Sequence, residues 1–402
     1  MRTARGSCRD FPKVRTKPEA TELDFEHSEK ERLFRSAVRE FVDAEVVPNA
    51  MRWEEEDRFP HETWSRLAEL GLCGVSLPSE HGGAGEGKTL FYIATEELAR
   101  GSAGLAVAYL VGCGITMDGI VAAGTEEQKR EYVPRCTNGE LAFFALSEEH
   151  GGSDIAPMQV RYRRTDSGFV LDGTKTFISN GEEATFGIVF ATRDPALRHE
   201  GITAFVVEKA ARGLSVGKRE HKAGQHCSST TELVFDECEV PRGALLGEEG
   251  QGFRIALESI TKSRVAVAAQ ALGIATAAYD EAVRYSTERL AFGRPLAQHQ
   301  AIQFMLADMA TELEVARLLM YRAAWSIDHG HSSVCEAAMA KLYASEAAGR
   351  ICHDAVQLFG GYGYIHETPV ERFWRDQRVT EIYEGTSEMQ RIAIAREALR
   401  PE

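Results

Sequence analysis

Apolar positions follow three different patterns along the chain. From about residue 23 to 140 they recur at steps of three and four residues, as at Phe34 and Val38, which predicts amphipathic helices. From 141 to 251, short runs rich in Val, Ile, Phe and Thr are bounded by Gly, Asp, Asn and Pro, which predicts closely spaced strands without helices between them. From 252 to 402 the helical period returns.

This segregated order predicts an α+β fold. We expect an N-terminal helical domain that begins after a cap at Ser28, a middle antiparallel β-sheet or barrel domain and a C-terminal four-helix bundle. The long helices of the bundle are predicted at 264–287, 302–328 and 333–359.

The first residues differ from the rest of the chain. Residues 1–17 carry six Arg or Lys residues and a single acid, Asp10, and they lack the apolar core of a secretory signal. We expect residues 1–22 to be a disordered basic leader, with a mitochondrial transit segment as the alternative reading. The predicted compartment is therefore the cytoplasm if the chain is bacterial, and the mitochondrial matrix otherwise.

Composition and charge exclude several classes of function. The chain has 402 residues, with 46 Lys and Arg against 61 Asp and Glu, and this net charge of −15 argues against nucleic-acid binding. The longest uncharged run, 101–117, is short and rich in small residues, so we expect a buried helix and no integral membrane segment. The eight cysteines include no C-x-x-C pair and no zinc-like spacing, which predicts reduced thiols and no metal site.

Five segments carry the candidate chemistry. They read ALSEEHGGSD at 145–154, GTKTFISN at 173–180, ERLAFGR at 288–294, QLFGGYG at 357–363 and IYEGTS at 382–387. In this order and at these separations they resemble the acyl-CoA dehydrogenase family. Each motif alone is weak, but all of them in register, within the helix–sheet–helix order, give a specific signal over most of the chain.

The resemblance implies an FAD-dependent enzyme that converts an acyl-CoA thioester to the trans-2-enoyl-CoA. It implies acyl-CoA as the substrate, an electron-transfer flavoprotein as the electron acceptor and a homo-oligomer, expected to be a tetramer. The chemistry needs a base for a weakly acidic α-proton, donors for the charge that develops on the thioester oxygen, and a hydride acceptor over Cβ. By resemblance the donors are the backbone N–H of Glu384 and a ribityl hydroxyl of the flavin.

The motif match assigns the base to Glu384. A carboxylate in a dry pocket has its pKa raised toward the working pH, where it serves best as a general base. Some branches of the family place the base just before the arginine of the first bundle helix, but here Ser263 precedes Arg264, which supports Glu384 and a short-, medium- or short-branched-chain type. Glu384 could also favour the N-terminal dipole of the helix that follows it. Gly385 is expected to let the substrate approach the backbone.

The remaining site residues are carried over from the resemblance. Contacts to the flavin ring are expected from Phe144, Leu146, Ser147, Phe177, Ile178 and Ser179. Contacts to the rest of FAD are expected from Ser153, Arg289, Phe292, His299, Gln300, Gln357, Gly360, Gly361, Thr386 and Glu388. Substrate contacts are expected from Ser153, Thr261, Arg264 and Gly385. Phe177, Ser179 and Thr261 depart from the residues that the family often has at these places, which are Trp, Thr and Asp or Asn.

Two alternatives remain open at the level of sequence. One is an acyl-CoA oxidase or another flavoenzyme of this scaffold that reacts with O2. The other is a catalytically silent homologue that binds acyl-CoA or serves in assembly. The sequence also leaves the acyl group open among short, medium, branched, cyclic and aromatic groups.

Overall fold

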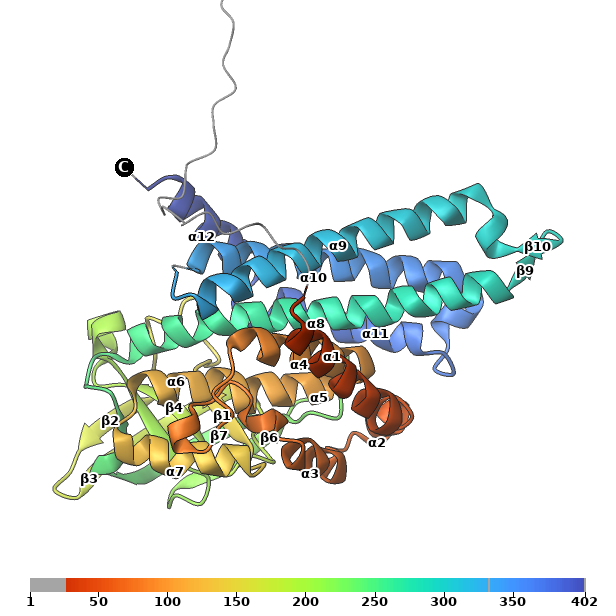
Figure 1. The fold of residues 1–402 in the computed structure, drawn as a ribbon. Coiled ribbons are helices and arrows are strands. Elements are labelled where there is room, and N and C mark those ends of the chain that lie inside the picture. The colour runs from red at the N-terminus through yellow and green to blue at the C-terminus, as the bar shows by residue number, and fades with distance from the viewer. Residues whose placement is uncertain (1–26, 332, 401–402) are drawn as a thin grey trace, which may run out of the picture.

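The computed structural model describes residues 27–331 and 333–400. The N-terminal helices and the sheet lie together on one side, and the long C-terminal helices lie across them (Figure 1). The predicted order of helices, sheet and helices is confirmed. The basic leader predicted at 1–22 lies outside the described residues.

The first helix begins where the sequence predicts it. The hydroxyl oxygen of Ser28 accepts a hydrogen bond from the backbone N–H of Glu31 at 3.2 Å, and the Glu31 carboxylate accepts one from the Ser28 N–H at 2.8 Å. This reciprocal capping box satisfies N–H groups that the first turn of a helix leaves free. The N-terminal helices are α1 (Glu29–Phe41), α2 (Ala50–Glu56), α3 (His61–Glu69), α4 (Lys88–Gly101), α5 (Ala103–Tyr109), α6 (Thr116–Ala123) and α7 (Glu126–Thr137).

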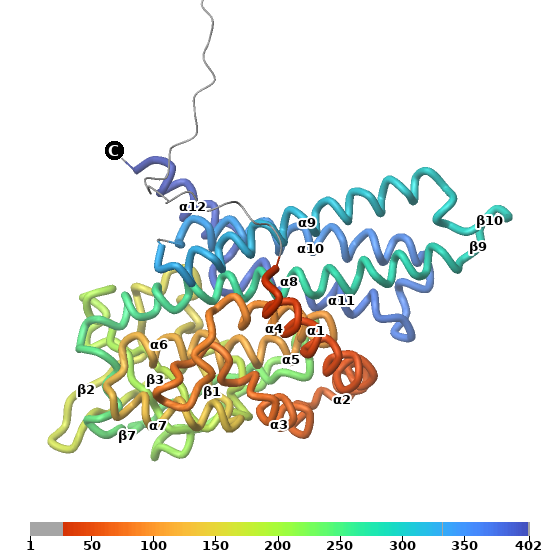
Figure 2. The backbone as a smooth tube through the Cα atoms, viewed as in Figure 1, coloured from red at the N-terminus to blue at the C-terminus, as the bar shows by residue number. Residues whose placement is uncertain are grey.

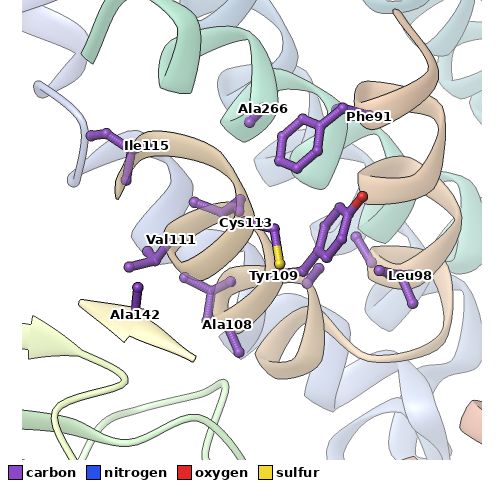
Figure 3. Packing of buried hydrophobic residues seen from close by; sticks show 14 of the residues in the cluster. Phe91, Leu98, Ala108, Tyr109, Val111, Cys113, Ile115, Ala142 and Ala266 are labelled. Atoms are coloured by element: carbon purple, nitrogen blue, oxygen red, sulfur yellow. The ribbon is translucent and has the colours of Figure 1, made fainter. Parts of the chain in front are cut away.

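A π-helical turn, Leu110–Ile115, joins α5 and α6 into one apolar stretch over 103–123. By length and composition this stretch could cross a membrane, and it is longer than the sequence suggested, but its residues are mostly buried inside the protein. Tyr109 shows how it is held, because its ring stacks on Phe91 of α4 at 4.8 Å (Figure 3). The Tyr109 hydroxyl donates to the Leu72 carbonyl at 2.9 Å. The stretch is therefore a core helix.

The middle domain is an eight-stranded sheet with the strand order β6-β7-β3-β2-β4-β5-β8, and β1 pairs with β4. Most pairs are antiparallel as predicted, but β1 and β2 both run parallel to β4. The apolar runs at 168–173 and 176–179 belong to one strand, β3, whose register against β7 shifts twice. The strands are β1 (Ala142–Ala145), β2 (Arg161–Arg164), β3 (Gly168–Ser179), β4 (Phe186–Thr192), β5 (Ile202–Glu208), β6 (Leu214–Arg219), β7 (Thr230–Pro241) and β8 (Leu245–Leu246).

Long helices form the C-terminal layer, and a short hairpin stands at one end of them (Figures 1 and 2). Helix α8 is 37 residues long, which at about 1.5 Å per residue is roughly 55 Å. It packs closely on α4, because a Cβ on Gly273 would lie 2.1 Å from the Glu96 carbonyl oxygen. The elements are α8 (Gly252–Glu288), β9 (Leu290–Ala291), β10 (Arg294–Pro295), α9 (Gln300–Asp328), α10 (Val334–Phe359), α11 (Pro369–Gln377) and α12 (Ser387–Ala398).

Candidate active site

Glu384 lies in a sharp turn between α11 and α12. Its φ is 52°, and the φ of Gly385 is 87°, so two consecutive residues adopt the left-handed region. For glutamate this conformation is uncommon, and such strain collects at functional sites. Thr386 then caps α12, and its hydroxyl oxygen accepts from the Met389 N–H at 3.4 Å. Glu384 therefore stands two residues before the helix cap.

The electrostatic surroundings of Glu384 suit a general base. The residue as a whole is only partly buried, but its carboxyl group lies deep enough that burial raises its pKa to about 7. The positive charges of Lys341 and Arg264 act in the opposite direction and lower that pKa. A carboxyl group with this pKa is half ionised near neutral pH, where a base works best.

Two donors converge on the backbone beside Glu384. The ammonium group of Lys341, from α10, donates to the Gly385 carbonyl oxygen at 2.6 Å. The Gln390 side chain, from α12, donates to the same oxygen at 2.7 Å and to the Glu384 carbonyl oxygen at 3.2 Å. Both side chains are fully buried. These bonds hold the left-handed turn in place.

Helix α8 contributes two polar groups to the same place. Desolvation lowers the pKa of the Arg264 guanidinium, and its Nε is buried without a partner among the described residues. The hydroxyl of Ser263 is buried as well, and its interaction with the Glu384 carboxyl group lowers the pKa of that group. A Cβ added at Gly385 would lie 4.0 Å from an Nη atom of Arg264, so Arg264 lies at the turn of Glu384. Thr261 bonds within α8, where its hydroxyl donates to the Leu257 carbonyl at 2.8 Å.

The residues predicted for the flavin ring gather at the end of β1 and along β3. The Ser147 carbonyl oxygen accepts from the Thr176 N–H at 3.0 Å, which joins the two segments. Phe177 has a φ of 56° where the register of β3 shifts, and its side chain is 65% exposed. Leu146 and Ile178 are buried, whereas Phe144 and Ser179 are partly exposed. A buried lysine of β3 holds the segment after β1: Lys175 Nζ donates to the Leu146 carbonyl at 3.0 Å and forms an ion pair with Glu148 at 2.7 Å.

A second group lies at the hairpin end of the long helices. Arg289, Gly360 and Gly361 line a cavity of about 540 Å³, and Arg289 lies 5.6 Å from the centre of the Tyr362 ring. A Cβ added at either glycine would meet nothing within 4 Å. The other members of this group are exposed or partly exposed: Phe292, His299, Gln300 and Gln357.

The Glu384 turn and the group at the hairpin end are far apart within the chain. Arg264 and Arg289 are both tied to α8, and the helix between them spans about 38 Å at 1.5 Å per residue. The structure therefore brings together Glu384, Gly385 and Arg264, and separately Arg289 and the two glycines. Ser153 and Glu388 are exposed.

Comparison with known proteins identifies the family. Models of the N-terminal, middle and C-terminal domains of acyl-CoA dehydrogenase match residues 28–140, 143–238 and 250–399. The chain belongs to the acyl-CoA dehydrogenase family. The resemblance drawn from the motifs is thereby confirmed, and with it the fold class and the prediction of an FAD-dependent enzyme of this family.

Several relatives in the acyl-CoA dehydrogenase family are similar over almost their whole length. The mitochondrial short-chain specific acyl-CoA dehydrogenase of Rattus norvegicus is 43% identical over 98% of this chain and 95% of its own. The solved structure of butyryl-CoA dehydrogenase from Megasphaera elsdenii has a TM-score of 0.92 and 39% identity, over 94% of this chain and 100% of that chain. A solved structure described as the electron transferring flavoprotein of Acidaminococcus fermentans has a TM-score of 0.93 and 40% identity, with the same coverage.

Sequence reasoning missed the supporting residues of this acyl-CoA dehydrogenase site. Lys341 and Gln390 carry no motif, and the only signal of Lys341 is a single charge in an apolar run, Ala338-Met-Ala-Lys-Leu342. Lys175 stands inside a matched segment, but only the fold reveals its contact with Glu148. In the described part of the chain, no group of three or more His, Cys, Asp or Glu residues could hold a metal ion.

Proposed function

We propose that this chain catalyses the FAD-dependent α,β-dehydrogenation of an acyl-CoA thioester to the trans-2-enoyl-CoA, with Glu384 as the base that removes the α-proton. The observation that carries the proposal is the carboxyl group of Glu384, held in a left-handed turn with a pKa raised to about 7. When bound, FAD supplies the acceptor for the hydride that leaves Cβ.

The residues at the two predicted cofactor regions fit FAD. At β3, the exposed ring of Phe177 offers an apolar face, and the hydroxyl of Thr176 is buried without a partner among the described residues. This combination suits a flat ring with polar edges. At the hairpin end, a guanidinium group beside two glycines that leave open space suits a pyrophosphate.

The separation of the Glu384 turn from the hairpin end favours a cofactor site that is shared between subunits. A single bound FAD does not reach from the Glu384 turn to Arg289, because the helix between these points spans about 38 Å. We therefore propose a homo-oligomer, as a tetramer, in which the hairpin end of one subunit completes the cofactor site of another. This arrangement agrees with the exposed positions of Phe292 and Leu290.

Groups of this chain accept the α-proton and stabilise the negative charge that develops on the thioester oxygen. The ionised carboxylate of Glu384 takes the α-proton and becomes a carboxylic acid. The backbone N–H of Glu384 has no acceptor among the described residues, so it is free to donate to the thioester oxygen as negative charge develops there. The Tyr383 hydroxyl, next to the base in the chain, donates to the buried side chain of Gln270 on α8.

For the substrate we propose a short straight-chain acyl-CoA, because the relatives named above are described as short-chain specific and butyryl-CoA dehydrogenases. For the electron acceptor we propose an electron-transfer flavoprotein, which the description of a similar solved structure supports.

The decisive experiment compares wild type with Glu384→Gln. The purified wild-type protein should be yellow, and butyryl-CoA with a dye acceptor should bleach its flavin absorption and turn over. Glu384→Gln should keep flavin and bind butyryl-CoA but lose turnover by about 10²–10⁴, the contribution typical of a general base. Turnover near the wild-type rate in this variant would show that another group is the base. Turnover with O2 alone would favour an oxidase, and no bleaching with any thioester would favour a silent homologue.

A further inference from the structure

Lys341 is a charged side chain in an interior position. It is fully buried in α10, and its ammonium group donates to the Gly385 carbonyl oxygen at 2.6 Å. Burial of an ammonium group is costly unless hydrogen bonds and nearby charge compensate for it, and a methionine would fill a similar volume without that cost. Packing alone therefore does not explain why a lysine occupies position 341.

We propose that Lys341 is a positioning residue for the base: it fixes the carbonyl group of Gly385 and supplies a buried positive charge that keeps the Glu384 carboxyl group ionised. The inference rests on the proposed function, because it takes Glu384 to be the group that accepts the α-proton.

The charge of Lys341 acts on Glu384 from a neighbouring helix. The charged groups that face Lys341 are Glu384, Arg264 from α8, Glu381 from the turn after α11, and Glu388 from α12. Of the groups that lower the pKa of Glu384, Lys341 has the largest effect and Arg264 follows. Burial lowers the pKa of Lys341 itself to about 8, so the ammonium group is still mostly charged at pH 6 to 7, where the base titrates.

Gln390 provides a matched comparison. It donates to the same carbonyl oxygen of Gly385, at 2.7 Å, and it is buried to the same degree, but it carries no charge. Loss of Lys341 removes one hydrogen bond from the left-handed turn, and loss of Gln390 removes two. Only the loss of Lys341 removes a positive charge as well. A merely structural role of Lys341 therefore predicts the same behaviour for both variants, whereas the proposal predicts different pH profiles.

The sign of the effect follows from the state in which the base acts. A carboxyl group accepts a proton only when it is ionised, and a nearby positive charge lowers its pKa by about one to three units. Without the charge of Lys341, the pKa of Glu384 rises. We expect the acidic limb of the pH profile to move up by about one pH unit, which makes the rate at pH 6 about ten-fold lower.

Five forms of the holoenzyme test the proposal: wild type, Lys341→Met, Lys341→Arg, Gln390→Leu and Glu384→Gln. The first readout is the pH profile of kcat/KM with butyryl-CoA and a dye acceptor. The second is the exchange of the acetyl hydrogens of acetyl-CoA in D2O, followed by mass spectrometry. Acetyl-CoA has α-hydrogens but no β-carbon, so it cannot be dehydrogenated. In this exchange the base takes a proton from the methyl group, loses it to solvent and returns a deuteron.

The outcomes separate this inference from the proposed function. Lys341→Met should shift the acidic limb upward in both assays, Lys341→Arg should restore the wild-type midpoint, and Gln390→Leu should lower the rate at an unchanged midpoint. An unshifted midpoint in Lys341→Met, or an equal shift in Gln390→Leu, would overturn the role of the charge. Exchange at the wild-type rate by Glu384→Gln would instead contradict the assignment of the base. Flavin content and Tm report on folding, and Lys341→Gln replaces Lys341→Met if that variant does not fold.

Discussion

The raised pKa of Glu384 has a consequence for stability as well as for catalysis. A carboxyl group with an ordinary pKa of 4.5 in the unfolded chain and about 7 in the folded protein binds its proton more tightly when folded. Below pH 4.5 the group is protonated in both states and causes no loss of stability. As the pH rises from 4.5 to 7 the folded state increasingly has to bury a charge, so stability falls and the full loss is present above pH 7. Glu384→Gln, which carries no charge at any pH, should escape this loss.

The magnitude follows from the size of the pKa difference. The difference between 4.5 and about 7 is about 2.5 units, and at 1.36 kcal/mol per unit it corresponds to about 3 kcal/mol. If all 402 residues unfold together with an entropy of about 2.1 cal/mol/K per residue, the change in Tm is about 4 °C. We therefore expect Glu384→Gln to melt about 4 °C above wild type at pH 8 and at the wild-type temperature near pH 4.5.

Calorimetry or flavin-independent fluorescence melting of both proteins between pH 4.5 and 8 measures this difference. Glu258→Gln, a change of an exposed glutamate on α8, serves as the control for a general effect of removing one negative charge. The reasoning would be refuted if the difference in Tm between Glu384→Gln and wild type were the same at pH 5 and pH 8. The same result in the control variant as in Glu384→Gln would also refute it.

Three further predictions concern catalysis and cofactor binding. A base with a pKa of about 7 is about one tenth ionised at pH 6 and about nine tenths ionised at pH 8. We therefore expect kcat/KM for butyryl-CoA to rise about ten-fold over this range in a stopped-flow or dye assay. A flat pH profile would contradict the assignment of Glu384 as the base. Arg289→Ala should lose flavin on dilution and gel filtration, which the ratio of flavin to protein absorbance reports, whereas full retention would count against a pyrophosphate contact. Lys175→Met removes the positive charge that pairs with Glu148 and leaves this carboxylate with the backbone N–H groups of Gln159 and Val160, so it should destabilise the protein by about 3 kcal/mol. Denaturant unfolding measures this, and the change Lys218→Met, at an exposed lysine on β6, is its control.

The extent to which the fold could be predicted differs between helices and strands. The long helices carry strong periodicity, and α9 and α10 lie within two residues of their predicted bounds. Helix α8 begins at Gly252 rather than Arg264, because no proline or glycine interrupts the residues between these positions. In the sheet, glycines bound many of the apolar runs in the sequence, but Gly173 lies within β3, with a φ of 128° where the register shifts. A glycine marks either a turn or a bulge, and the sequence alone does not distinguish them.

The candidate site shows a similar division. Glu384 stands in a motif, so the sequence reveals it, and the φ of 87° at position 385 explains why a glycine follows it. Lys341 and Gln390 act through burial and through contacts with the turn, which depend on how α10 and α12 pack. In the sequence, a lysine in an alanine-rich helix is indistinguishable from an exposed charge. Periodicity and motifs therefore do not reveal the buried polar side chains that support a site.

The length of α8 bears on the proposed oligomer, because this helix separates the Glu384 turn from the hairpin end. The helix carries Arg264 at the turn of Glu384 and ends next to Arg289, and Gly273 lets it pack closely on α4. The stretch of α8 from Arg264 to Arg289 is about 38 Å long, so the Glu384 turn and the hairpin end of one chain lie farther apart than one ligand can span. If both regions bind the same kind of cofactor, each molecule has to meet the Glu384 turn of one subunit and the hairpin end of another. Loss of flavin and loss of the oligomer are then coupled: dilution of Arg289→Ala should release both flavin and subunits, whereas Glu384→Gln should release neither.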